Sequence, residues 1–184
     1  LSNSKGYCYA SNEYIAKRLV RNRDYFGPLM LQHGDTDALI VGYSKNYRTV
    51  LRPVLEIIEK AKAVDKIASM MMILSDKKPY FFADTSIHVN PTPEEMANIA
   101  KMAEYAIKSF AIQPRIAMLS YENFSANSET SKKVAKAVNI LHQKYPDMIV
   151  DGEFQPDFAM SADHLQYYPF SKLGKTPANT FIFP

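Results

Sequence analysis

Cysteine is almost absent from this sequence, which has one in 184 residues, and glycine is scarce, with six. The lone thiol, Cys8, can form neither an internal disulfide nor a cysteine-based metal site, so we expect a reducing, cytoplasmic setting. With so few glycines and no cluster of them, the chain has no dinucleotide-binding or P-loop fingerprint. It also has no Gly-x-Ser-x-Gly nucleophile elbow, which removes one common class of hydrolase.

Long basic runs and long apolar runs are also missing from the sequence. The net charge is +3 with no extended basic stretch, which argues against a dedicated nucleic-acid or membrane surface. No run approaches the about 18 consecutive apolar residues of a membrane span. The apolar fraction of 47% and the charged fraction of 22% are ordinary for a soluble globular protein. The first residue is Leu1, with no leader pattern, and the last residues look like a strand end, so we interpret the chain as a piece of a longer protein.

The sequence alternates between short apolar runs and segments whose apolar residues recur at helical spacing. Capping residues at Thr92 and an apolar stripe to Phe110 predict a helix that ends before Pro114, and residues 131–145 predict another. Such alternation predicts right-handed βαβ units in a three-layer α/β/α sandwich. The strands are expected at Ala38–Gly42, Lys66–Leu74, Tyr80–Ala83, Arg115–Ser120, Met148–Val150 and Phe181–Phe183.

We expect two subdomains with a cleft between them. Residues 1–62 would form part of a first subdomain, with helices from Asn12 and from Tyr25 to about His33, and residues 63–184 would form a second α/β/α unit. The hinge is expected at residues 63–65.

Polar residues follow several of the predicted strands. Ligands of open α/β sheets bind beyond the carboxyl ends of the strands, so these side chains would face a ligand. The alternative is that they only cap the next helix and bond neighbouring loops. A magnesium site built from the four acidic members is a minor possibility. The predicted cleft residues are Asp84, Thr85, Ser120, Asn123, Asp151, Glu153, Gln155 and Asp157.

A second candidate site precedes a helix predicted from about Thr49 to Lys62. Because proline fits best in the first turn of a helix, Pro53 would place Ser44, Arg48 and Arg52 at a helix amino terminus. Such a terminus with two arginines suits an anion. Two solvated arginines are the alternative.

We expect the histidines and the consecutive methionines to have structural or surface roles. The three consecutive methionines at 70–72 are expected to fill core space. The histidines lie at no metal-binding spacing, so each is expected to be structural or on the surface. These are His33, His88, His142 and His164.

Several short stretches lie in order over most of the chain from Arg21: Tyr25–Gly27, His33–Ala38 with Gly42, Leu51–Pro53, Ala83–Thr85, Asn90–Thr92, Ser120, Asn123–Phe124, Asp147–Glu153 with Gln155 and Asp157, and Tyr168–Leu173. Together they resemble the phosphate acetyl/butyryltransferase family. Through Arg21–Gly27, Gly42–Ser44 and Asp157–Ala159, the version found here is most similar to the domain appended to large bacterial NADP-dependent malic enzymes.

The resemblance implies an isocitrate/isopropylmalate dehydrogenase-like fold whose cleft holds CoA. It assigns Arg52 to a CoA phosphate, with Ser44, Arg48 and Thr49 beside it. The family's catalytic Ser-Arg pair and aspartate would lie downstream of the last residue. Ser125-Ala126 and Lys175–Pro177 depart from the usual pattern.

Three functions follow. The first is a regulatory and oligomerising domain of a malic enzyme that binds acetyl-CoA or acetyl phosphate, while a separate amino-terminal part would use NADP and Mg²⁺ or Mn²⁺ to convert malate to pyruvate. We favour it because the local sequence resembles the malic-enzyme version and because the sequence alone shows no nucleophile or general base. The alternatives are part of an active phosphate acetyltransferase and a structural dimerisation module. This stretch alone is expected to be inactive, to need no cofactor of its own, and to bind neither nucleic acid nor membrane.

Overall fold

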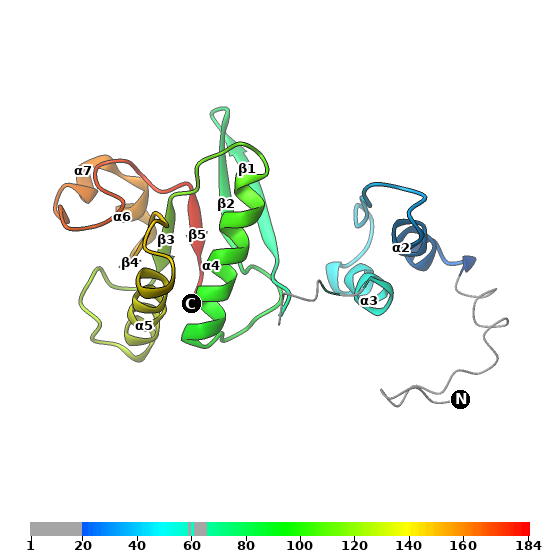
Figure 1. The fold of residues 1–184 in the computed structure, drawn as a ribbon, viewed down its shortest axis with the longest axis horizontal. Coiled ribbons are helices and arrows are strands. Elements are labelled where there is room, and N and C mark those ends of the chain that lie inside the picture. The colour runs from blue at the N-terminus through cyan, green and yellow to red at the C-terminus, as the bar shows by residue number, and fades with distance from the viewer. Residues whose placement is uncertain (1–19, 59, 61–65) are drawn as a thin grey trace. The chain divides into compact units, whose positions relative to one another are not determined.

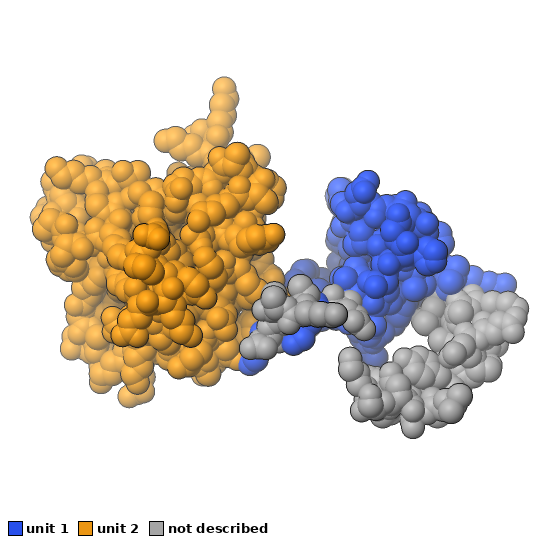
Figure 2. All heavy atoms as spheres, in the orientation of Figure 1, with its two compact units in different colours: residues 1–66 blue, residues 67–184 orange. Residues whose placement is uncertain are grey.

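The computed structural model describes residues 20–58, 60 and 66–184 and divides the chain into two compact units, residues 1–66 and 67–184 (Figures 1 and 2). The hinge predicted at residues 63–65 lies outside the described residues, as does most of the helix predicted from Asn12. In the described part of the chain, no helix is long and apolar enough to cross a membrane.

In the described part of the first unit, α2 (Arg23–His33) and α3 (Tyr47–Ile57) pack on each other. α2 starts where the Asn22 side chain accepts a hydrogen bond from the Asp24 amide, and it stops at Gly34, whose left-handed φ of 85° closes the helix. This confirms the predicted helix from Tyr25 to His33. The helical pattern predicts an inward-facing Phe26, but this side chain is 46% exposed, because no sheet among the described residues of this unit covers it.

The strand predicted at Ala38–Gly42 is not formed. Ile40 is 97% exposed and Val41 is 46% exposed, and the segment has no regular structure. A strand needs a neighbour to bond its backbone groups, and every strand of the described residues lies in the second unit.

The second unit is built on a mixed five-stranded sheet in the order β1-β2-β5-β3-β4. β1 pairs antiparallel with β2 as a hairpin, while β2, β5, β3 and β4 run parallel (Figure 1). The predicted α/β class is confirmed. The strands are β1 (Met70–Ser75), β2 (Lys78–Ala83), β3 (Ile116–Leu119), β4 (Val150–Phe154) and β5 (Thr180–Ile182).

Alternate residues of the central strands enter two separate cores, one on each face of the sheet. On β3, Ile116 and Met118 face the core under α4 (Pro93–Lys108) and α5 (Glu129–Lys144). Ala117 and Leu119 face the other core, which includes residues of α6 (Pro156–Met160) and α7 (Ala162–Leu165). Both faces of the sheet are therefore covered.

Only the first methionine of the run packs against a core, since Met70 is partly buried there. β1 is an edge strand, and Met71 and Met72 are 50% and 49% exposed, so the prediction that they fill core space is wrong. An apolar run predicts a strand, but only the strand order decides whether another layer covers it.

α4 begins with the predicted capping box. The Thr92 hydroxyl accepts from the Glu95 amide at 3.2 Å, and the Glu95 carboxylate accepts from the Thr92 amide at 2.7 Å. Both bonds satisfy amides that have no partner within the helix.

We expect Thr92→Ala to lower the free energy of unfolding by about 1 kcal/mol, because it removes the hydroxyl half of this box. Urea denaturation measures the change, and Thr92→Ser, which keeps the hydroxyl, should stay near wild type. Equal losses in the two variants would show that the hydroxyl is not what stabilises the start of α4.

Candidate functional site

Four parallel strands end at one edge of the sheet, which we call the carboxyl edge. β2 ends at Ala83, β3 at Leu119 and β4 at Phe154, and β5 lies between β2 and β3. Because the strands are parallel, the residues that follow them lie along this edge. Asp84, Ser120 and Gln155 are the first residues after their strands, as the sequence predicted for a ligand-facing edge.

Asp84 is held by an unusually complete set of donors for a side chain that is only 2% exposed. Its Oδ1 accepts from the amides of Ser69, Ser86 and Ile87 at 3.1, 3.2 and 3.3 Å, and from the Ser69 hydroxyl. Its Oδ2 accepts from the His88 amide at 2.9 Å. Thr85 joins the same cluster through its amide, which donates to the Ser69 hydroxyl at 3.1 Å.

This environment decides the charge of Asp84. Burial alone would raise the pKa of this carboxyl, but the bonds from Ser69, from His88 and from backbone amides outweigh burial and hold the pKa far below its usual range. Asp84 is therefore a carboxylate at neutral pH.

The imidazole of His88 completes the cluster. Its Nδ1 lies 2.6 Å from Asp84 Oδ2. A carboxylate can only accept a hydrogen bond, so Nδ1 carries the proton and donates it. The neutral ring then has its lone pair on Nε2, which points away from the carboxylate. A histidine oriented by a buried carboxylate is the geometry that proton-transferring residues use.

The contact with Asp84 is compatible with the structural role predicted for His88, which stays a prediction. No pattern in the sequence indicates the pair, since Asp84 and His88 are four residues apart in an irregular loop, where spacing does not predict contact.

A second polar cluster joins the loop after β3 to the end of β4. Asn123 and Gln155 exchange two hydrogen bonds. Asn123 Nδ2 donates to Gln155 Oε1 at 2.7 Å, and the backbone amide of Gln155 donates to Asn123 Oδ1 at 2.9 Å. Glu153 Oε1 accepts from the amides of Ser125, at 2.8 Å, and Ala126. The second oxygen of Glu153 is buried and has no hydrogen-bond partner in the described part of the chain.

Glu153 reaches this loop because of an irregularity in β4. Gly152 pairs with Met118 and Phe154 pairs with Leu119, so Glu153 is an extra residue between two registered pairs. Such a bulge turns a side chain away from the regular alternation. The strand continues to Phe154, although the sequence predicted that it would end at Val150 with a loop beyond it.

The remaining predicted cleft residues have structural positions. Asp151 lies within β4, and its carboxylate accepts from the amides of Lys172 at 2.7 Å and Gly152 at 3.0 Å. Ser120 bonds Ser131 of α5, with 2.6 Å between the hydroxyls.

Asp157 is exposed in the first turn of α6. This position fits the alternative that the acidic residue only supports the start of the next helix. The magnesium alternative is not supported, because among the described residues no three His, Cys, Asp or Glu side chains could hold a metal ion together.

The predicted anion site has a different geometry from the one expected. α3 starts at Tyr47, where Asn46 accepts from the Arg48 amide at 3.0 Å, so Arg48 and Thr49 lie in the first turn and Ser44 precedes the helix. The prediction that Pro53 marks the first turn is wrong. Pro53 lies inside α3, because the Asn46 cap sets the start of the helix.

Arg52 is accordingly about a turn beyond the helix start. Its Nε donates to Glu56 Oε1 at 2.7 Å, and the Tyr25 hydroxyl donates to the other oxygen at 2.8 Å. The bonds from Arg52 and Tyr25 lower the pKa of Glu56. The Arg52 side chain is 79% exposed, so its charge remains accessible to a ligand.

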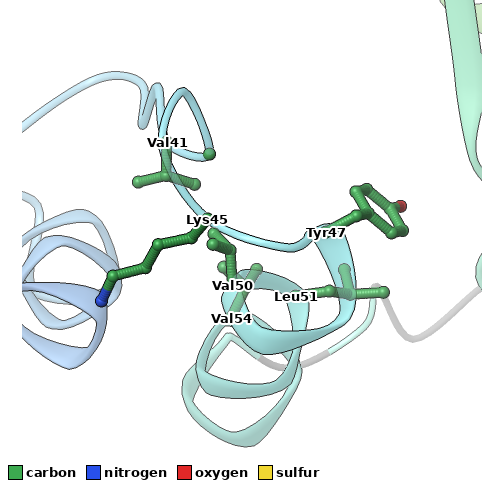
Figure 3. Close-up of a pocket in the computed structure, with 7 residues that line it drawn as sticks. Val41, Lys45, Tyr47, Val50, Leu51 and Val54 are labelled. Atoms are coloured by element: carbon green, nitrogen blue, oxygen red, sulfur yellow. The ribbon is translucent and has the colours of Figure 1, made fainter.

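A hollow of about 220 Å³ lies beside α3 (Figure 3). Its walls are mostly apolar, and Lys45 extends across it to pair with Asp24 of α2. None of Ser44, Arg48, Thr49 and Arg52 lines it, so it is distinct from the predicted anion site. The lining residues are Val41, Gly42, Lys45, Tyr47, Val50, Leu51 and Val54.

Comparison with known proteins places the chain in a family. Residues 4–184 match the phosphate acetyl/butaryl transferase family, and the chain belongs to it. It is 33% identical to a phosphate acetyltransferase of Bacillus subtilis over 95% of this chain and 54% of that protein. It is 35% identical to an NADP-dependent malic enzyme of Rhizobium meliloti over 98% of this chain and 23% of that protein.

Solved structures agree with this assignment. A phosphotransacetylase from Streptococcus pyogenes matches with a TM-score of 0.80 and 31% identity, over 93% of this chain and 53% of that one. The chain thus spans about half the length of this phosphotransacetylase and of the matched acetyltransferase, and about a quarter of the malic enzyme.

Proposed function

We propose that this chain supplies the acetyl-CoA and phosphate site of a phosphate acetyltransferase, which moves an acetyl group between the sulfur of CoA and phosphate. Membership of the family and the 33% identity to the Bacillus subtilis phosphate acetyltransferase over 95% of this chain support this proposal. The site would include the carboxyl edge, where Asp84, Ser120 and Gln155 directly follow three parallel strands.

The reaction needs few further chemical groups from the protein. The thiolate of CoA attacks the acetyl carbonyl directly, so no nucleophile from the protein is needed. Positioning of the two substrates and stabilisation of charge supply most of the rate. Arg52, in the first unit, stays a predicted ligand of a CoA phosphate, as the family resemblance implies.

A second candidate is the acetyl-CoA-sensing domain of an NADP-dependent malic enzyme. The 35% identity to the Rhizobium meliloti enzyme over 98% of this chain favours it. In that case the same site would bind acetyl-CoA without turnover, and malate would be oxidised by another part of the protein. Homo-oligomerisation and a cytoplasmic location stay predictions under both candidates.

The two candidates are separated by assays of the whole protein that contains this chain. We expect CoA thiol to be released from acetyl-CoA only when phosphate is present, with acetyl phosphate as the second product. Absence of this release, together with malate oxidation that responds to acetyl-CoA, would replace the proposal with the second candidate.

Arg52 gives a test of ligand binding that both candidates share. We expect Arg52→Ala to weaken acetyl-CoA binding about ten- to a hundredfold, because a well-formed charge-assisted bond to phosphate is worth roughly 1.5–3 kcal/mol. Arg52→Lys should recover only part of the affinity, since an ammonium cannot form the bidentate contact.

Calorimetric titration of acetyl-CoA into the whole protein measures this effect, with thermal melts as the folding control. Arg23→Ala is the matched control, because Arg23 is also an exposed arginine in the first unit but lies outside the predicted anion site. Equal affinities for Arg52→Ala and Arg23→Ala would leave Arg52 as an ordinary surface charge.

A further inference from the structure

The segment of residues 38–42 has the side-chain alternation of a strand, although it has no neighbouring strand among the described residues. Leu39 packs against α2, since a Cβ built on Gly27 would lie 2.7 Å from its Cδ1. Val41 lines the hollow beside α3 (Figure 3). Ile40, between them, is 97% exposed. Both helices therefore lie on one face of the segment, and Ile40 points to the opposite face, which no described residue covers.

The backbone of this segment is also without partners. Among the described residues, the N–H and C=O groups of residues 38–42 make no hydrogen bond. Water can bond such groups in a loop, but a run of four apolar side chains from Ala38 to Val41 is typical of a buried strand. A row of free donors and acceptors flanked by apolar side chains is the kind of edge to which another strand adds.

The position between two helices indicates the kind of sheet that the segment would join. Residues 34–37 and 43–46 connect it to α2 and α3, and connections of about two to six residues are usual in α/β units. Strands that alternate with helices in this way run parallel to their neighbours. Apolar side chains on both faces of the segment, Leu39 and Val41 against Ile40, are the pattern of a parallel strand that is covered on both sides.

We propose that in the whole protein residues 38–42 form a strand of a second parallel sheet, whose other strands come from parts of the same polypeptide outside this chain. α2 and α3 would form the layer over one face of this sheet. A further apolar layer, also from outside this chain, would cover Ile40. The neighbour whose lack leaves the segment irregular in this structure would then be supplied.

The lengths of the matched proteins favour the same polypeptide as the source of these strands. This chain spans 54% of the Bacillus subtilis acetyltransferase and 53% of the Streptococcus pyogenes phosphotransacetylase, so about half of each lies outside the matched stretch. It spans only 23% of the Rhizobium meliloti malic enzyme, so the inference holds for both candidate functions. A second copy of this chain, related by a two-fold axis, would add one antiparallel neighbour and leave the other edge of the strand unpaired.

Hydrogen–deuterium exchange of the whole protein tests the pairing without any variant. We expect the amides of residues 39–41 to exchange at least about a hundredfold more slowly than those of the β1–β2 turn at Asp76 and Lys77, because bonded amides exchange only when the sheet opens. Exchange as fast as in that turn would overturn the inference.

Thiol labelling of the whole protein tests the layer over Ile40 separately. Ile40→Cys and Val89→Cys are a matched pair, because both side chains are β-branched and Val89 is 94% exposed but lies outside any apolar run. We expect a maleimide to label the Ile40→Cys protein at position 40 at least about a hundredfold more slowly than the Val89→Cys protein at position 89, and at a similar rate in denaturant. Peptide mapping assigns the labelled position, so native thiols such as Cys8 do not interfere. Equal rates in the native proteins would overturn the inference.

Dilution identifies the source of the layer that protects position 40. Protection that persists when light scattering shows only monomers is the result expected for strands of the same polypeptide. Protection that disappears on dilution would assign the layer to a second copy and would overturn the inference.

Discussion

Replacing Gly152 with alanine should unfold the second unit or leave it barely stable. A Cβ at this position would lie 2.5 Å from the carbonyl oxygen of Met118 and 2.9 Å from its Cβ, closer than such atoms approach in proteins. The φ of 153° is also one that residues with a side chain rarely adopt. Overpacking costs about 1–3 kcal/mol and an unfavourable backbone region about 1–3 kcal/mol more, which together take much of the stability of a domain.

The position explains why the structure cannot relax around the added methyl group. Gly152 of the edge strand β4 pairs with Met118 of β3, and cores on both faces fix the two strands. A shift of β4 would also move Glu153, whose carboxylate holds the loop at Ser125 and Ala126. The damage should therefore reach the carboxyl edge as well as the core.

Chemical denaturation followed by circular dichroism measures this loss, and Gly174→Ala is the matched control. Gly174 has a left-handed φ of 57°, but an alanine methyl group there would meet no atom within 4 Å, so only the backbone cost of about 1–2 kcal/mol applies. Similar losses in the two variants would contradict the close packing of β3 against β4.

Asp84→Ala should cost about 3 kcal/mol of unfolding free energy, because several part-buried donors would lose their acceptor at once and a fully buried unsatisfied group costs about 1–3 kcal/mol. The affected amides are those of Ser69, Ser86, Ile87 and His88. Asp84→Asn should cost less, since the amide oxygen still accepts some of these bonds.

The contribution of Asp84 should also depend on pH. Its pKa in the folded protein is far below the value of about 3.9 in an unfolded chain, so the carboxylate stabilises the fold fully above the unfolded pKa. This stability is lost as the pH falls below about 4 toward the folded pKa. The stability difference between wild type and Asp84→Asn should therefore be constant from pH 5 to 7 and shrink in acid. A difference that grows in acid would contradict the charge assigned to Asp84.

Features that rest on local chemistry were predictable from the sequence. The start of α4 follows from the Thr92 capping box, and the end of α2 follows from Gly34, because neighbouring residues alone decide both. β3 was placed within a residue or two because its short apolar run has no competing local pattern.

Features that depend on distant partners were not predictable. The exposure of Met71 on β1 follows from the strand order, and the lack of a strand at Ala38–Gly42 follows from the lack of a neighbour. The bulge at Glu153 depends on the register of β4 against β3. For the site, the sequence indicated the carboxyl edge and Asp84, but only the folded loop brings His88 against that carboxylate.

Hydrogen–deuterium exchange of the whole protein, with and without acetyl-CoA, tests the central claim that the ligand binds at the carboxyl edge. We expect acetyl-CoA to slow exchange in peptides covering residues 84–92 and 120–128, which follow β2 and β3. Peptides at the opposite edge, such as those covering the β1–β2 turn at Asp76 and Lys77, should exchange at unchanged rates. Protection that is absent from both carboxyl-edge loops while acetyl-CoA is bound would contradict the account.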